Sequence, residues 1–275
     1  RLGRPLASLR PSEREMIRYL VLGAVQGVTE FLPISSSGHL VLFQRLVGLD
    51  PPGVLLEALL HWGTLAAVIV VFRSDLVSLA RALTSRGSIE GRKEIGLIVA
   101  GTVPIVVIGL LWRTSIAELF ASTLVLGGSF LATGLLLALT GVIRRRAERN
   151  QAGFPDALGV GLAQAAALLP GFSRSGATIA AGVFAGLTPR RAARFSFLLA
   201  VPALFGAGLL SLWDGLRSGV ETPWLGLALG ALTSFVVGLL AIRALLALVS
   251  RGRLWVFSIY CVALGVLVLV GLGAP

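Results

Sequence analysis

The sequence predicts an all-α polytopic membrane protein, with six transmembrane helices and two re-entrant helix–loop–helix hairpins in an inverted-topology repeat. Three observations predict this fold: an apolar composition, six long apolar runs, and a weak internal repeat centred on two Pro-Ser-Gly stretches. Of 275 residues, 56% are hydrophobic and 13% are charged, whereas about 25% are charged in a typical soluble domain. Water therefore cannot be the solvent for most of the surface.

Six apolar runs are each long enough, or nearly so, to cross a hydrocarbon core of about 30 Å as a helix. Arginine clusters lie between these runs and not along one basic face, which argues against a nucleic-acid partner despite the net charge of +11. The single cysteine, Cys261, excludes an intrachain disulfide and a thiolate metal cluster. The six runs cover residues 54–72, 95–112, 119–143, 195–213, 223–248 and 254–273.

The polar and basic N-terminus precedes the chain's only methionine, Met16. We expect residues 1–15 to be a disordered extension and residues 16–275 to form a single membrane domain. Within that domain, repeat one covers about 17–143 and repeat two about 155–273.

The internal repeat aligns GAVQGVTEFLPISSSG at 23–38 with GLAQAAALLPGFSRSG at 161–176, and IVVIGLL at 105–111 with SFVVGLL at 234–240. Repeats with interrupted helices are typical of membrane proteins that build a polar site near the bilayer midplane. The first alignment pairs Gly23 with Gly161, Gln26 with Gln164, Ser35 with Ser173, Ser37 with Ser175, and Gly38 with Gly176.

Each Pro-Ser-Gly stretch separates two apolar segments that are too short to span a bilayer in one piece. Pro33 and Pro170 each remove a backbone donor, and irregular backbone at membrane depth is tolerated only where it is buried in protein or lines a wet cavity. We therefore predict two re-entrant hairpins, with a kinked spanning helix as the alternative for each. The flanking segments are 17–32 and 38–48 in the first hairpin, and 157–169 and 175–187 in the second.

The positive charges predict the orientation. If the hairpins do not cross, the loops 73–93, 144–156, 188–194 and 243–253 share one side and carry five, four, three and three Lys or Arg, 15 of the 24 in the chain. Such loops lie in the cytoplasm. The first hairpin then enters from outside and the second from inside, and the arginines of the N-terminal tail lie outside, against the same rule.

Ionisable residues within apolar segments are functional candidates because burying them in a membrane is costly. Gln26 and Glu30 are four residues apart and share one helix face, His39 follows in the same hairpin, and Arg174 lies in the second hairpin. A guanidinium pairs well with phosphate oxygens, and Gly-Ser loops at helix N-termini favour anions. A serine can attack phosphorus if Glu30 or His39 takes its proton, although Ser-rich turns also serve as plain helix caps.

Two motifs, EFLPISSSGHL at 30–40 and LLPGFSRSGATI at 168–179, closely resemble the signature motifs of the bacterial undecaprenyl pyrophosphate phosphatase family, which is linked to bacitracin resistance. The resemblance covers nearly the whole chain from about Met16. It implies hydrolysis of undecaprenyl diphosphate, a polyprenyl diphosphate lipid, to the monophosphate for peptidoglycan synthesis. It also implies a bacterial inner-membrane location, an active site that faces the periplasm, and a divalent cation, Mg²⁺ or Ca²⁺.

By motif position, the resemblance implies a role for each catalytic candidate. Glu30 matches the second acidic residue of the family, Ser36 the proposed nucleophile, His39 the proposed base or nucleophile, and Arg174 the phosphate-binding arginine. The candidate phosphate-binding residues are Gln26, Ser35, Ser37, Ser173, Ser175 and Thr178.

Gln26 departs from the family pattern, since many members have Glu at this position. A neutral amide binds a cation more weakly than a carboxylate does. We therefore expect Gln26 to position its neighbours by hydrogen bonding, and Glu30 is left as the single metal-ligand candidate.

Two other functions fit parts of the pattern. Re-entrant hairpins in inverted repeats are also transporter architecture, so a polyprenyl-phosphate transporter is the main alternative, and phosphate release from detergent-solubilised protein would separate the two. A lipid phosphate phosphatase would need a second histidine, followed by an aspartate, after the Ser-Arg motif, but no histidine follows His61. We expect His61 itself to be structural. Prenyl chain length and oligomeric state, a homodimer included, stay open.

Overall fold

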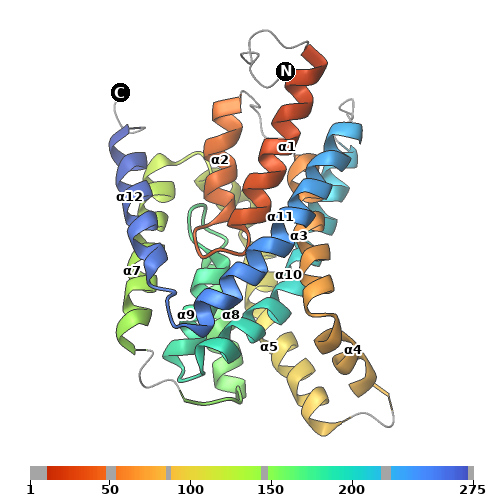
Figure 1. Ribbon diagram of the computed structural model, residues 1–275, viewed down its shortest axis with the longest axis vertical. Coiled ribbons are helices and arrows are strands. Elements are labelled where there is room, and N and C mark those ends of the chain that lie inside the picture. Colours follow the sequence, from red (N-terminus) through yellow and green to blue (C-terminus); the bar gives the residue numbers. More distant parts are fainter. Residues whose placement is uncertain (1–10, 48–53, 85–87, 144–147, 218–223, 272–275) are drawn as a thin grey trace.

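The computed structural model describes residues 11–47, 54–84, 88–143, 148–217 and 224–271 (Figure 1). This part of the chain is all-helical and contains no β-strand. The helices are α1 (Pro11–Thr29), α2 (Ser36–Val47), α3 (Val54–Val71), α4 (Arg73–Ala82), α5 (Ile89–Leu111), α6 (Arg113–Leu119), α7 (Thr123–Ile143), α8 (Phe154–Ala166), α9 (Arg174–Phe184), α10 (Pro189–Arg217), α11 (Trp224–Ser250) and α12 (Val256–Gly271).

Within the described residues, each predicted apolar run is mainly helical, which confirms the all-α prediction. The helices α5, α7, α10 and α11 are long and apolar enough to cross a membrane, α3 and α4 form a pair bent by 77°, and α12 is a shorter apolar helix. Helices satisfy all their backbone hydrogen bonds internally, which is why they are the form that such apolar runs take in lipid. The chain is a multi-pass membrane protein.

The two Pro-Ser-Gly stretches form short loops between helices, as predicted. Residues 30–35 join α1 to α2, and residues 167–173 join α8 to α9. In Figure 1 the pair α1/α2 occupies the upper part of the molecule and the pair α8/α9 the lower part, with both loops near mid-height. The first loop touches the first turn of α9, because the Ser175 hydroxyl donates a hydrogen bond of 3.2 Å to the carbonyl oxygen of Leu32.

The N-terminal prediction needs one correction. Helix α1 begins at Pro11, so residues 11–15 are helical and not part of a disordered extension. Proline is favourable at the first position of a helix because its missing N–H would have no partner there. Residues 1–10 lie outside the described residues, and the division into two repeats stays a prediction.

Glycines let one helix of each hairpin pack closely on a long apolar helix. A Cβ at Gly23 of α1 would lie 2.3 Å from the carbonyl oxygen of Gly230 in α11, and a Cβ at Gly161 of α8 would lie 2.4 Å from that of Gly101 in α5. Small residues at membrane helix contacts allow such backbone approach.

These two contacts are related by the sequence repeat. Gly23 aligns with Gly161, and when the alignment of 105–111 with 234–240 is extended towards the N-terminus it pairs Gly101 with Gly230. Each hairpin therefore packs against a long helix from the other half of the chain.

Replacing Gly161 by alanine should destabilise the protein. Its Cβ would meet the backbone of α5, and overpacking of this kind costs about 1–3 kcal/mol. Gly159 is the matched control on the same helix, since a Cβ there meets nothing within 4 Å and alanine is the better helix former. Thermal unfolding in detergent should show a lower Tm for Gly161→Ala and an unchanged or higher Tm for Gly159→Ala; equal values for the two variants would contradict this packing.

Candidate active site

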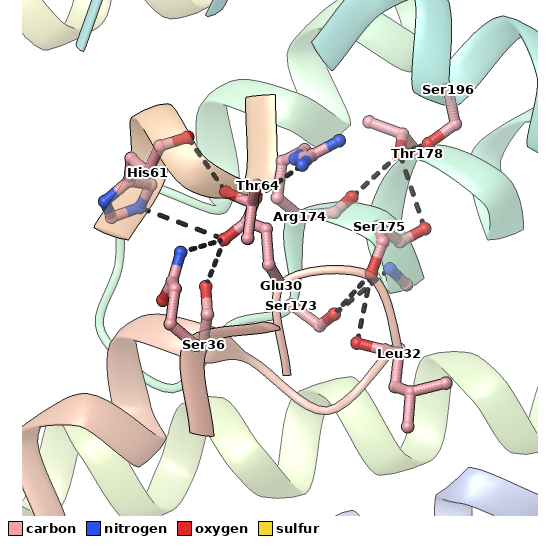
Figure 2. A network of polar contacts seen from close by, with 12 residues as sticks. Glu30, Leu32, Ser36, His61, Thr64, Ser173, Arg174, Ser175, Thr178 and Ser196 are labelled. Atoms are coloured by element: carbon pink, nitrogen blue, oxygen red, sulfur yellow. Dashed lines mark hydrogen bonds and ion pairs between the residues drawn. The ribbon is translucent and has the colours of Figure 1, made fainter. Parts of the chain in front are cut away.

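Glu30 lies at the centre of a polar network where the two loops meet (Figure 2). It is buried, with 5% of its surface exposed. Its Oε2 accepts hydrogen bonds from the Ser36 hydroxyl at 2.6 Å and from the Gln26 amide at 3.1 Å, and its Oε1 accepts one from Arg174 Nη2 at 2.6 Å. His61 Nε2 lies 3.8 Å from Oε2. Both hairpins and α3 therefore supply groups to one carboxylate.

Helix ends explain why these groups converge. Glu30 directly follows α1, Ser36 is the first residue of α2, and Arg174 is the first residue of α9. The C-terminal end of a helix disfavours a carboxylate, so the burial of Glu30 depends on Arg174. The N-termini of α2 and α9 carry free N–H groups and a positive dipole end, an environment that favours a phosphate.

The serines next to Ser36 and Arg174 cap these two helices in the same way. Ser35 Oγ accepts from the Gly38 N–H at 3.3 Å, and Ser173 Oγ accepts from the Gly176 N–H at 3.1 Å. A side-chain cap satisfies a donor that the first turn of a helix leaves unpaired. Because these pairs are related by the repeat, Ser36 and Arg174 occupy equivalent positions at the starts of α2 and α9.

The other predicted phosphate-binding serines lie in the same two turns. The hydroxyls of Ser35 and Ser37 are 3.3 Å apart, as are those of Ser173 and Ser175. Their hydrogen bonds stabilise the loops, and direct phosphate binding by them stays a prediction.

Thr178 supports Arg174 from within α9. Its hydroxyl donates to the carbonyl oxygen of Arg174 at 2.8 Å and, with that proton used, accepts from the Ser196 hydroxyl of α10 at 2.6 Å. Sequence reasoning missed Ser196, which is fully buried. A serine between two phenylalanines in an apolar run was the available signal.

His39 makes its hydrogen bonds away from Glu30. Its Nδ1 lies 2.7 Å from the carbonyl oxygen of Ser35, and its Nε2 lies 2.6 Å from the hydroxyl of Tyr260 in α12. Tyr260 was also missed, because nothing in its local sequence connects it to the hairpins. The predicted role of His39 as base or nucleophile stays a prediction.

His61 approaches the same carboxylate from α3, and its expected structural role stays a prediction. Its Nδ1 lies 2.7 Å from the carbonyl oxygen of Glu57 one turn earlier in α3, which leaves Nε2 directed at Glu30. Like Glu30 and Arg174, His61 is an ionisable side chain within or beside an apolar run.

Two polar atoms of the site have no hydrogen-bond partner among the described residues. They are Nη1 of Arg174, a donor, and Oε1 of Gln26, an acceptor, and both are buried. A free guanidinium donor near a serine hydroxyl suits an oxyanion such as phosphate.

The donors beside Glu30 fit a divalent cation only in part. Within the described residues, no group of three or more His, Cys, Asp or Glu side chains could hold a metal ion. Glu30 supplies one carboxylate and Gln26 one unpaired amide oxygen. Such a set suits a cation like Mg²⁺ that keeps water and binds substrate phosphates, and it does not suit a cage made of protein ligands alone.

Comparisons with known proteins match nearly the whole chain. The family model described as bacitracin resistance protein BacA matches residues 19–267. A protein named undecaprenyl-diphosphatase from Desulfosudis oleivorans is 47% identical over 91% of this chain and 96% of its own length. Proteins of the same name from Rubrobacter xylanophilus and Desulforapulum autotrophicum are 44% and 41% identical, each over 92% of this chain and 97% of its own length.

A double-mutant cycle should reveal the coupling between Glu30 and Arg174. Glu30→Gln leaves a buried guanidinium without its charge partner, and breaking a buried pair in this way costs about 3–5 kcal/mol. Adding Arg174→Gln should recover part of the lost Tm, because no uncompensated charge then remains. Thermal unfolding in detergent measures all four proteins.

The exposed pair Arg113–Asp214, whose side chains are 52% and 35% exposed, is the matched control. Its own cycle should show coupling of no more than about 1 kcal/mol. If the losses of stability in Glu30→Gln and Arg174→Gln were strictly additive in the double variant, the buried pair would not hold the two hairpins together.

Proposed function

Because the chain belongs to the bacitracin resistance protein BacA family, we propose that it is an undecaprenyl-diphosphatase. It is a membrane hydrolase that cleaves undecaprenyl diphosphate to undecaprenyl phosphate and inorganic phosphate. This reaction recycles the lipid carrier of peptidoglycan synthesis and accounts for the link to bacitracin resistance. The single observation that carries the proposal is the convergence of Ser36 and Arg174 on the buried carboxylate of Glu30.

Ser36 is the proposed nucleophile. Its hydroxyl is 2.6 Å from Glu30 Oε2, within the reach expected of a nucleophile and its general base. Glu30 takes the proton as Ser36 Oγ bonds to the terminal phosphorus, and the bond from that phosphorus to the bridging oxygen breaks. Undecaprenyl phosphate leaves with the electron pair of the broken bond.

Water completes the cycle. Glu30 gives the proton it took from Ser36 to the departing undecaprenyl phosphate, then takes a proton from a water molecule that attacks the phosphoserine. The bond between phosphorus and Ser36 Oγ breaks, Glu30 returns its proton to the serine oxygen, and inorganic phosphate leaves. The hydrogen bond between Ser36 and Glu30 favours this hydrolysis over simple transport, because a transporter needs neither a nucleophile nor a base.

Arg174 stabilises the charge that develops on the phosphate. In phosphoryl transfer the protein contributes mainly positioning and electrostatic stabilisation. The side chain of Arg174 is 13% exposed, and its Nη1 is available to a phosphate oxygen while Nη2 stays on Glu30. The N-termini of α2 and α9 add backbone N–H groups to the same place.

His39 is the less favoured nucleophile. Its two ring nitrogens are engaged by Ser35 and Tyr260, and an attack through Nε2 would first have to break the bond to Tyr260. Ser36 needs no such rearrangement.

A divalent cation, Mg²⁺ or Ca²⁺, belongs to the proposal as a charge-neutralising partner of the diphosphate. Glu30 and the amide oxygen of Gln26 are the residues that would hold it, with the remaining ligands from phosphate and water. When bound, the cation would withdraw charge from the phosphate oxygens.

For the arrangement in the membrane, we propose six spans and two re-entrant hairpins related by an inverted repeat. The reciprocal glycine contacts, Gly23 with Gly230 and Gly161 with Gly101, support this topology. The arginine-rich loops support a cytoplasmic location for that side of the protein. The site then opens towards the periplasmic side of the bacterial inner membrane, where the diphosphate head enters while its prenyl chain stays in lipid.

Arg174→Ala should abolish turnover while the protein stays folded at the assay temperature. Loss of a transition-state arginine lowers kcat by about 10³-fold or more. Arg174→Lys keeps the charge but not the planar fork of the guanidinium, so its kcat should lie between that of the wild-type protein and that of Arg174→Ala. Phosphate release from purified, solubilised protein measures the effect, with Arg113→Ala, at the exposed pair with Asp214, as the control of near-normal activity. Near-normal hydrolysis by Arg174→Ala would rule out the assigned role.

A further inference from the structure

We propose that Tyr260 is a positioning residue for the reaction. Its hydroxyl fixes the ring of His39, His39 holds Ser35 in a left-handed conformation, and this turn directs Ser36 at Glu30. The inference rests on the proposed function, in which Ser36 attacks the diphosphate. It gives a role to a residue that lies 221 positions from His39 in the sequence.

The hydrogen bonds of His39 define one tautomer of the neutral ring. The carbonyl oxygen of Ser35 can only accept, so Nδ1, at 2.7 Å, carries the proton and donates it. Nε2 is then the acceptor, and the Tyr260 hydroxyl donates to it at 2.6 Å. The bond made by one ring nitrogen sets the state of the other.

Two aromatic rings restrict the same imidazole. The ring of Tyr260 stacks on it with a centroid distance of 5.6 Å and an interplanar angle of 11°, and Phe130 of α7 meets it edge-on at 5.5 Å and 87°. His39 is 3% exposed. The next residue of α12, Cys261, contacts the same loop, with its sulfur 3.6 Å from the carbonyl oxygen of Pro33. Helix α12 therefore supports the first hairpin at two points, His39 in α2 and Pro33 in the loop.

Ser35 shows why this support is needed. Its φ of 70° is the only positive value for a non-glycine residue in the described part of the chain, and such a conformation costs about 1–3 kcal/mol. The repeat-related Ser173 has a φ of −78°. The counterpart of His39 in the second repeat is Ala177, which bonds to Ser173 through its backbone alone. The strained serine and the histidine that bonds to it thus occur together, in the first hairpin and not in the second.

The length of the reacting side chain explains the asymmetry. Ser36 and Arg174 occupy equivalent positions and both reach Glu30. Arginine can reach through its long side chain, whereas serine has one rotatable bond to its oxygen, so the backbone itself must bring Ser36 to the carboxylate. The left-handed turn at Ser35, held by His39, sets that backbone. Misplacement of a reacting group by about 1 Å can cost 10²-fold in rate.

Tyr260→Phe tests the inference because it removes one hydroxyl and keeps the stacked ring. We expect kcat for phosphate release to fall about 10- to 100-fold, with little change in KM or Tm. Tyr19→Phe, at the only other tyrosine of the chain, should keep wild-type kinetics. His39→Gln keeps a side-chain donor for Ser35 and should retain more activity than His39→Ala.

Nitrogen-15 NMR of the imidazole groups provides a readout that does not depend on hydrolysis. The chain has two histidines, so a His61→Gln variant assigns the signals of His39. The wild-type protein should show the Nδ1–H tautomer at His39. In Tyr260→Phe the nitrogen-15 signals of His39 should shift or report a mixture of the two tautomers. If the wild-type protein released no phosphate, the proposed function would fail while this spectrum could still be read.

Three results would overturn the inference. Wild-type kcat in Tyr260→Phe would show that the hydroxyl does not act in the reaction. An unchanged spectrum of His39 would show that it does not fix the ring. A large fall in Tm, with KM and kcat equally affected, would make Tyr260 a purely structural residue.

Discussion

The ion pair between Glu30 and Arg174 is the interaction on which the rest of the site depends. A carboxylate at the C-terminal end of a helix and away from water is unfavourable unless a cation and hydrogen-bond donors surround it. Arg174 supplies the charge from the opposite hairpin, and Ser36 and Gln26 supply the hydrogen bonds. The contact that makes this burial tolerable also brings a hydroxyl, a carboxylate and a guanidinium together, which the proposed reaction uses as nucleophile, base and phosphate-binding group.

The two hairpins share the features that bring Glu30 and Arg174 together, but they differ at the residue that follows the serine cap. Both loops cap a helix with a serine, and both hairpins pack through a glycine against a long helix of the other half. At the position following the cap, one repeat has Ser36 and the other has Arg174. A short side chain requires a fixed backbone turn, whereas a long one does not, which accounts for the strain at Ser35 and its absence at Ser173.

Much of this molecule can be predicted from local sequence. The apolar runs determine the long helices because lipid leaves the backbone no other partner, and Glu30, Ser36 and Arg174 stand out because polar residues are rare among apolar segments. Ser196 and Tyr260 were missed because their contacts come from packing between distant segments. Tyr260 lies in an ordinary apolar run, and only the fold brings α12 to the first loop. The helical state of residues 11–15 was missed because a polar stretch was taken for a disordered one.

The most direct test of the account is to find where the phosphate resides during turnover. Rapid quenching of the enzyme with undecaprenyl diphosphate, in acid and in alkali, followed by peptide mass spectrometry, distinguishes acid-stable phosphoserine from acid-labile phosphohistidine. The account predicts a phosphate on Ser36 in the acid-quenched protein and none in Ser36→Ala. A phosphate found on His39 in the alkaline quench, with Ser36 unmodified, would contradict it.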